Sequence, residues 1–206
     1  MSIIYPLTPP ALGIARVRLT AENAVGYDES PFTFRGQSFE WPGARWQLEV
    51  TLPPLKPSDA KLWIAFLLSL RGQVGTFNMG DPAYQKTGSG VGIDNLQVAQ
   101  IAGSSTLPCY NAPPNASGYL AAGDYVQLGL GASATLHRVL QDVNTNASGE
   151  YAIEIWPPAS EDLNINRAIY LNDPVATWRL AGDSIGWDVN TARHYGISFN
   201  AVQVVP

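Results

Sequence analysis

Apolar and polar side chains alternate along several stretches of the chain, which is the pattern of strands with one buried face. Residues 14–20 alternate in this way, as expected for a half-buried strand. Residues 32–41 have the pattern of a hairpin with Gly36 in its turn. Residues 46–51 alternate again, and two consecutive prolines then end the strand, because proline has no amide hydrogen for a sheet ladder.

One segment has the apolar density of a buried helix. Ser58 fits an N-cap, Asp59 places a negative charge in the first turn, and Arg71-Gly72 provides a basic last turn and a stop, so we predict a helix over residues 58–71. Apolar side chains between these ends cover nearly the whole circumference: Leu62, Trp63, Ile64, Phe66, Leu67, Leu68 and Leu70. Such a helix needs cover on more than one side. We predict that it anchors the core and that another subunit covers part of it, with these interface candidates: Trp63, Ile64, Leu67 and Leu68.

A second β unit is predicted after the helix. Residues 74–79 are typical of a strand closed by the turn at 80–82, and residues 84–115 are small, polar and glycine-rich, with a short strand at 96–101. Strand patterns follow between residues 119 and 156, interrupted by a polar turn. Closely spaced short strands of this kind favour a small antiparallel barrel of the SH3 or OB type.

The last part of the chain has four strand-like segments, at residues 168–171, 176–180, 185–189 and 195–205. We expect the last and longest to pair beside the N-terminal strands, which makes the barrel an insertion. The expected organisation is therefore mostly β. Residues 1–87 and 173–206 form one domain, a β-sandwich with one flanking helix, and residues 88–172 form the inserted barrel.

Composition adds a hint about the surface. The chain is 46% apolar but only 14% charged, whereas globular domains average about 25% charged residues. A surface covered by neighbouring subunits needs less charge than a free one, so the low value favours a multi-subunit setting. Sixteen prolines and nineteen glycines favour short strands and tight turns over a helical bundle.

The charge distribution and the apolar runs exclude several classes of function. The net charge is −5 and the 12 basic residues are scattered, so we expect no specific nucleic-acid binding and no docking on anionic membranes. The longest apolar run, residues 62–68, is far shorter than the roughly 20 residues that span a bilayer. The first ten residues lack the pattern of a signal peptide, so synthesis in the cytoplasm is expected. A single cysteine, Cys109, excludes an internal disulfide framework.

Sequence motifs for metals, phosphates or covalent catalysis are not present in the chain. The glycines at 88, 90 and 92 lack the spacing of a dinucleotide fingerprint and indicate a flexible loop. Asp142-x-Asn144-x-Asn146 begins like a calcium loop, but Ala147 and Ile153 occupy the positions of the required glycine and glutamate. A hairpin turn explains this segment better, and we predict no cofactor, metal or catalytic residue.

Isolated reactive residues have structural interpretations as well. His137 lies mid-strand, His194 precedes the last strand, and Cys109 has no neighbour that would lower its pKa. Asp81, Asp124 and Asp183 each follow a glycine, as turn formers do. Paired-carboxylate chemistry on glycans stays open. Five tryptophans could form a sugar platform, although core packing is favoured for most: Trp41, Trp46, Trp156, Trp178 and Trp187.

The order of these features is similar to one family. It comprises Phe34-x-Gly36, Trp46, the helix with Arg71-Gly72, Gly75-x-Phe77-x-x-Gly80-Asp81-Pro82, Leu120-x-x-Gly123-Asp124-x-Val126, Pro157, Trp178-x-Leu180 and Ser198-Phe199. Across most of its length the chain thus resembles the distal tail and minor tail proteins of long-tailed (siphovirus-type) bacteriophages.

The resemblance implies a structural virion protein of the tail tip or baseplate. In that family a tail-tube-like domain forms a ring, usually a hexamer, which joins the tail tube to the baseplate hub and other tail-tip proteins. A second β domain projects outward, and DNA passes through the lumen. The expected protein is therefore not an enzyme, is made in the bacterial host cytoplasm, and does not enter a membrane. Two alternatives remain: a carbohydrate-binding or glycan-hydrolysing β-protein, and a tail terminator or head–tail connector.

Overall fold

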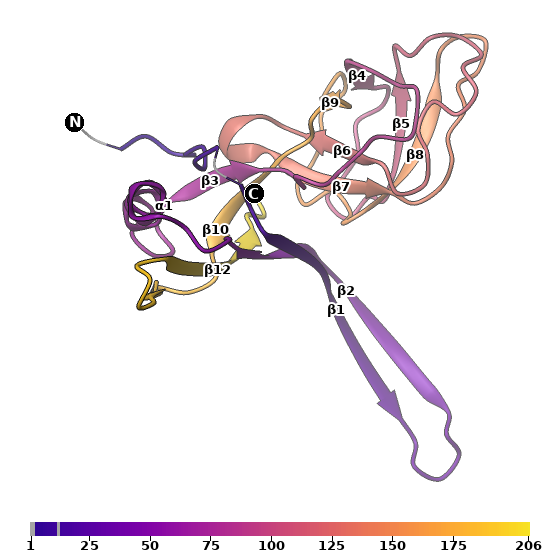
Figure 1. The fold of residues 1–206 in the computed structure, drawn as a ribbon. Helices are drawn as coiled ribbons and strands as arrows, with labels where there is room; N and C mark the ends of the chain where they lie inside the picture. The colour runs from indigo at the N-terminus through magenta and orange to yellow at the C-terminus, as the bar shows by residue number, and fades with distance from the viewer. Residues whose placement is uncertain (1–2, 12) are drawn as a thin grey trace.

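The computed structural model describes residues 3–11 and 13–206 and consists mostly of β-strands in two units (Figure 1). The sheet unit contains β1 (Arg16–Glu29), β2 (Gly36–Thr51), α1 (Pro57–Ser69), β3 (Thr76–Met79), β10 (Ala176–Leu180), β11 (Trp187–Val189) and β12 (Tyr195–Gln203). The other unit contains β4 (Ile93–Leu96), β5 (Thr106–Tyr110), β6 (Tyr125–Leu128), the short 3₁₀ helix η1 (Gly131–Ser133), β7 (Thr135–Val139), β8 (Tyr151–Trp156) and β9 (Ala168–Tyr170). The predicted fold class, mostly β with one α-helix and a small barrel, is confirmed.

Antiparallel pairing gives the sheet the order β1-β2-β12-β10-β3, with β11 added to β12. The last strand pairs with β2 as predicted, placing Phe199 opposite Val50. The strands of the other unit form a closed barrel, β4-β5-β8-β7-β6-β9. They lie in the chain between β3 and β10, which are themselves neighbours, with Trp178 opposite Phe77. The chain therefore leaves the sheet for the barrel and returns to it through adjacent strands.

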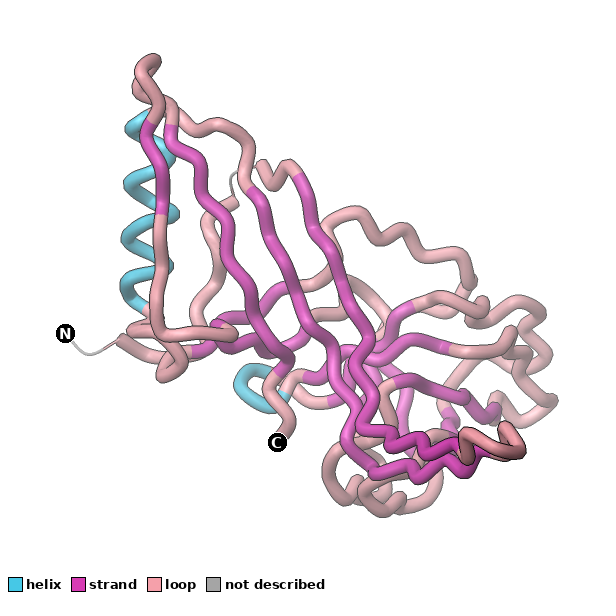
Figure 2. The backbone as a smooth tube through the Cα atoms, turned by 90° about the horizontal axis from the view of Figure 1, so that it is seen from below, coloured by secondary structure: helices cyan, strands magenta, loops and turns pink. Residues whose placement is uncertain are grey.

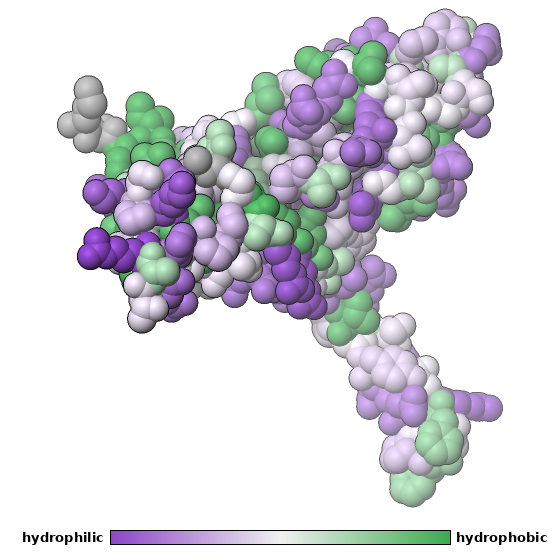
Figure 3. Space-filling model, viewed as in Figure 1, coloured by the Kyte–Doolittle hydropathy of each residue, from purple (hydrophilic) through white to green (hydrophobic). Residues whose placement is uncertain are grey.

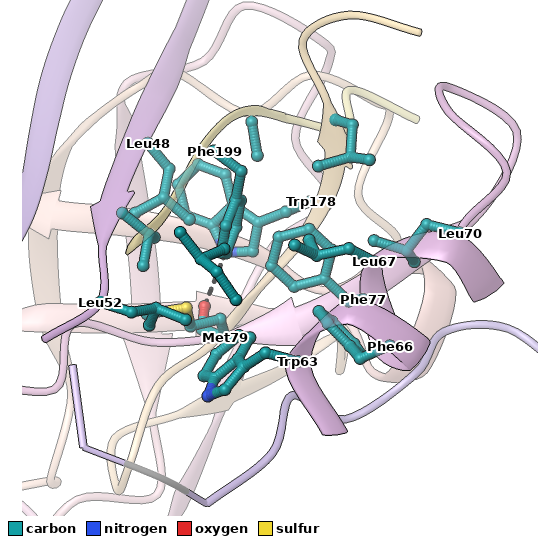
Figure 4. Close-up of a cluster of buried hydrophobic side chains, with 14 of the residues drawn as sticks. Leu48, Leu52, Trp63, Phe66, Leu67, Leu70, Phe77, Met79, Trp178 and Phe199 are labelled. Atoms are coloured by element: carbon teal, nitrogen blue, oxygen red, sulfur yellow. Dashed lines mark hydrogen bonds between the residues drawn. The ribbon is translucent and has the colours of Figure 1, made fainter. Parts of the chain in front are cut away.

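Helix α1 covers one face of the sheet (Figure 2). Its buried side chains, among them Trp63 and Leu67, pack with Phe77, Trp178 and Phe199 (Figure 4). The helix begins at Pro57, whose missing amide hydrogen costs nothing at that position. The predicted N-cap at Ser58 was wrong, because Lys56 occupies the cap and Ser58 is already helical. No helix in the described residues is long and apolar enough to cross a membrane.

The barrel has its own core, and two buried carboxylates tie its strands and loops. Asp94 accepts hydrogen bonds from the hydroxyls of Tyr119 (2.7 Å) and Tyr151 (2.5 Å) inside the barrel. Asp124 accepts the backbone amides of Thr87 and Gly88, both at 2.8 Å. This second carboxylate therefore fixes the connection from β3 against the barrel.

A joint of aromatic side chains connects the two units. The Trp46 and Trp156 rings meet edge to face with centroids 4.5 Å apart. Trp46 Nε1 donates to the Leu136 carbonyl at 3.1 Å, and Trp156 Nε1 donates to Asn23 Oδ1 at 2.7 Å. Tyr125 and Leu136 of the barrel belong to the same buried cluster as α1 and the sheet. The two units are therefore packed together rather than loosely linked.

The hairpin of β1 and β2 is longer than the sheet that carries it. The neighbouring strand β12 accompanies β2 only as far as Gln47, so residues 22–45 form a two-stranded ribbon, called the arm below. The arm projects from the body of the molecule (Figures 1 and 2). A hairpin was predicted here with Gly36 in its turn, but the chain reverses over residues 30–35 and Gly36 is the first residue of β2.

Candidate assembly surface

The arm carries a group of large apolar side chains that its own chain does not cover. At its tip, Phe32 is 92% exposed and Phe34 is 77% exposed. Further exposed apolar residues lie along both strands: Val25, Tyr27, Phe39 and Trp41. Figure 3 shows hydrophobic residues at the end of the projecting arm. Single exposed apolar residues are common on proteins, but six large ones on one short ribbon indicate an interaction surface.

The turn at the tip holds the two phenylalanines in place. Ser30 donates its amide to the Arg35 carbonyl at 3.0 Å, and Phe34 donates its amide to the Ser30 carbonyl at 2.9 Å. Phe34 has a φ of 53°, in the left-handed region that bulky residues rarely adopt. Such a conformation costs on the order of 1–3 kcal/mol and is found mainly where function requires it.

Two aromatic rings along the arm lie over glycines of the facing strand. The Trp41 ring lies 3.0 Å from the point that a Cβ of residue 26 would occupy. The Tyr27 ring similarly fills the space beside Gly36. Aromatic residues diagonal to a glycine cover its bare backbone and stabilise isolated strand pairs. Both rings are thereby fixed on the surface of the arm instead of being free to turn inward.

An irregularity in β2 separates the outer arm from its root. Asn23 pairs with Ala44 and Val25 pairs with Glu40, so residues 41–43 face Ala24 alone. Extra residues on one strand bend the ribbon and increase its twist. At the root, Arg45 Nε donates to Glu22 Oε2 at 2.6 Å. This hydrogen bond holds the pKa of Glu22 below its ordinary value.

A cleft of about 580 Å³ lies where the root of the arm meets the barrel. It is lined mainly by small residues: Ala24, Gly43, Ala44, Ala102, Gly103 and Ala159. Arg45 and Glu22 line one part of it. Small side chains around a concavity leave room for a large one, so the cleft is suited to receive a bulky apolar group.

The face of the sheet opposite α1 is open and polar. Apolar residues of β2 and β12 point toward α1, while the alternate residues point away from it. Across the whole sheet, the charged residues that point away from α1 are four arginines and three carboxylates: Arg16, Arg18, Arg45, Arg179, Glu22, Glu49 and Asp188. A hollow of about 490 Å³ on this face includes Arg18 and Arg45. Arg45 lines both this hollow and the cleft, so the two concavities lie side by side at the root of the arm.

The four interface candidates from the sequence do not lie together on the surface. Trp63 and Leu67 are fully buried between α1 and the sheet, so within one chain they leave no surface for a partner. They are one helical turn apart and share the face that packs on the sheet. Ile64 is half-buried and packs against the same core. Leu68 is 56% exposed and alone of the four is open to a partner.

The titratable and nucleophilic candidates are built into the fold. His137 is buried between Thr135 Oγ1 at 2.8 Å and the Pro157 carbonyl at 2.6 Å, and burial lowers its pKa to about 4. Cys109 lies in the barrel core, where burial raises the pKa of its thiol. His194 is half-buried in the loop before β12. These residues do not meet one another in a site.

The remaining candidates also have structural roles. Asp81 accepts the Ala83 amide at 3.0 Å, and the side-chain oxygen of Asn146 accepts the amides of Ser148 and Glu150. The calcium-like segment is therefore a polar turn, and no cluster of metal-ligating side chains occurs among the residues the structure describes. Of the five tryptophans, three pack at the joint or in the sheet core, whereas Trp41 and Trp187 are exposed.

Comparison with protein-family models and with curated proteins finds no match for the chain.

Proposed function

We propose that this protein is a structural subunit of a bacteriophage tail tip, which assembles with copies of itself into a ring that joins the tail tube to the baseplate hub and host-recognition parts. The resemblance noted in the sequence suggests a hexamer. The observation that carries the proposal is the arm, whose aromatic residues extend beyond the body of their own chain.

An arm left alone in water is energetically costly. A two-stranded ribbon without a covering surface is marginally stable. Each aromatic side chain removes on the order of 150–250 Å² from water when it is covered, at about 25 cal/mol per Å². Several of them on one ribbon favour a partner that covers the arm. Interlocking copies in a ring supply that cover in every subunit.

The two edges of the sheet support self-assembly as well. The β3 edge is occupied, because Leu7 donates its amide to the Thr76 carbonyl at 2.8 Å and accepts the Asn78 amide at 2.9 Å. At the other edge, β1 has no further strand beside it within the described residues. Proteins usually protect long open edges, because the unpaired backbone groups there can bind a strand of another chain. The open edge of β1 is therefore available for pairing with a neighbouring subunit.

Light scattering after size-exclusion chromatography tests the proposal. The wild-type chain should form a species whose mass is a multiple of 22.2 kDa and whose population rises with concentration. The double variant Phe32→Ser/Phe34→Ser should stay monomeric and folded, because neither ring packs in its own core. The matched control is Leu140→Ser/Ile165→Ser, at barrel positions that are 50% and 59% exposed, which should assemble as the wild type does.

A protein that is monomeric at every concentration would contradict the proposal. If that monomer bound or cleaved a glycan, the carbohydrate-active alternative would replace it. Exposed Trp41 beside Glu40, on a second cleft of about 430 Å³, is the place where such binding would be sought, because aromatic rings and carboxylates are the usual partners of sugars.

A further inference from the structure

We propose that the tip of the arm of one copy docks into the cleft at the root of the arm of the next copy, with the outer arm lying along the arginine-bearing open face of that copy's sheet. This inference rests on the proposed self-assembly and names the surface that receives the arm. The contact is head-to-tail, because tip and root are different surfaces of the same chain.

Size and polarity match between the two surfaces. The tip presents Phe32 and Phe34 on a narrow turn, and half of the residues that line the cleft of about 580 Å³ are alanine or glycine. Ligand-sized apolar concavities fall in the range of about 300–1,000 Å³. Buried aromatic anchors in such pockets carry most of the energy of protein interfaces. The small residues of the cleft are thus explained as space for a partner's aromatic side chain.

Charge matches as well. The outer arm, residues 24–43, contains Asp28, Glu29 and Glu40 against Arg35, a net charge of −2. The open face has the opposite balance, with four arginines against Glu22, Glu49 and Asp188, a net charge of +1. This face stands out because the whole chain has a net charge of −5. Opposite charge steers two surfaces together and fixes their register.

The geometry excludes docking within one copy. Residues 21–29 of β1 carry the tip away from the root, and a strand rises about 3.3 Å per residue, so the separation is about 30 Å. The ribbon points away from the body along its length (Figure 1). Each copy therefore offers one tip and one cleft to different neighbours. Heterologous contacts of this kind close into a ring when the rotation between copies allows it.

Cysteine cross-linking tests this contact. The natural Cys109 is buried, so an introduced surface cysteine is the reactive one. Thr33→Cys places a thiol at the tip and Ala102→Cys places one in the cleft. When these two single variants are mixed and oxidised, a disulfide-linked dimer should form. The control pairs Thr33→Cys with Ser148→Cys, an exposed position in a barrel turn, and should give at least roughly tenfold less product.

Charge reversal provides a second measurement. Arg18→Glu on the open face should raise the concentration at half-assembly roughly tenfold. Asp28→Lys on the outer arm should weaken assembly in the same way, because it reverses a charge on the surface that the open face is proposed to meet. Lys61→Glu, on the exposed side of α1, is the matched control and should leave assembly unchanged.

The outcomes separate this inference from the proposed function. Assembly with preferential tip-to-cleft cross-linking supports both. If the protein assembles but Thr33→Cys cross-links equally with Ala102→Cys and Ser148→Cys, or with neither, the docking inference is overturned. The proposed ring would still stand in that case. A monomer under all conditions overturns both. Cosedimentation of the protein with phosphatidylcholine vesicles, lost in Phe32→Ser, would also overturn the inference, since the tip would then serve a lipid surface.

Discussion

Protonation of His137 should weaken the fold in mild acid. The imidazole is fully buried between β7 and the segment after β8. A carbonyl oxygen only accepts hydrogen bonds, so Nδ1 must carry the hydrogen that it donates to the Pro157 carbonyl at 2.6 Å. Nε2 then accepts the hydroxyl hydrogen of Thr135 at 2.8 Å. A second ring proton would point at this hydroxyl and leave a positive charge in the core.

The magnitude follows from the two pKa values of the histidine. Burial lowers the pKa of His137 from 6.5 to about 4 in the folded protein, whereas the unfolded chain keeps the ordinary value. Below pH 6.5 the unfolded state therefore binds a proton at His137 that the folded state does not bind. The free energy of unfolding should fall as pH decreases from 6.5 to 4, by about 3 kcal/mol in total.

Urea unfolding followed by tryptophan fluorescence, at one protein concentration and at several pH values between 7.5 and 4, measures this slope. His137→Gln should abolish it, because glutamine can hydrogen-bond to both neighbours without titrating. His194→Gln, at the other histidine, should keep it. The titration of Asp124 does not interfere with assigning the slope to His137. Although burial raises the pKa of Asp124, the amides of Ala121, Thr87 and Gly88 hold the net value below normal, so its contribution is lost only at lower pH.

Equal slopes in the wild type and His137→Gln would refute the assignment. An NMR titration that found His137 with a pKa near 6.5 in the folded protein would refute the buried neutral imidazole itself.

Three further predictions concern contacts inside the fold, and the urea midpoint measures each. Asp124→Asn should cost about 1–3 kcal/mol, because one carboxylate oxygen becomes an NH₂ group facing the amides that it now accepts; no loss would mean that these amides are satisfied by water. Trp46→Phe should cost a similar amount, because the buried Leu136 carbonyl loses its indole donor; Trp187→Phe on the exposed β11 is the control. Gly149→Ala should cost at least about 1 kcal/mol, because its φ is 74° and the added methyl group would collide with the Ala112 carbonyl. An unchanged midpoint there would show that the turn relaxes freely.

The sequence pattern predicted well those strands and helices that have one buried side. The alternation at residues 46–51 became the sheet strand with Leu48 and Val50 inside, and the apolar helix became α1. The apolar density of the helix did not show which of its side chains face the sheet and which face outward. Trp63 and Leu67 face the protein's own sheet, whereas Leu62 and Leu68 face outward. Counting apolar residues around a helix does not say which of them a single chain already covers.

A hairpin was predicted at residues 32–41, but the length of the arm and the position of its turn were not predicted, for a related reason. Periodicity reveals a strand when one face is apolar and the other polar, but both faces of the arm are exposed, and apolar residues occur on both of its faces. The diagonal placement of Tyr27 and Gly36 could have served as a signal, since an aromatic residue near a glycine in a hairpin often covers that glycine. The Trp46–Trp156 joint links residues far apart in sequence, and no local pattern encodes such a contact.

The adjacency of β3 and β10 has a consequence for how such a chain can change over time. Because Met79 and Ala176 are paired residues, a tight loop between them would close the sheet without disturbing its register, and a different module could occupy the same place. The barrel is therefore exchangeable as far as the backbone of the sheet is concerned. Its replacement must, however, supply a hydrogen-bond acceptor and an apolar surface for Trp46. Variation in the inserted unit is thus constrained mainly where that unit meets the sheet, at Trp46, Asn23 and Thr177.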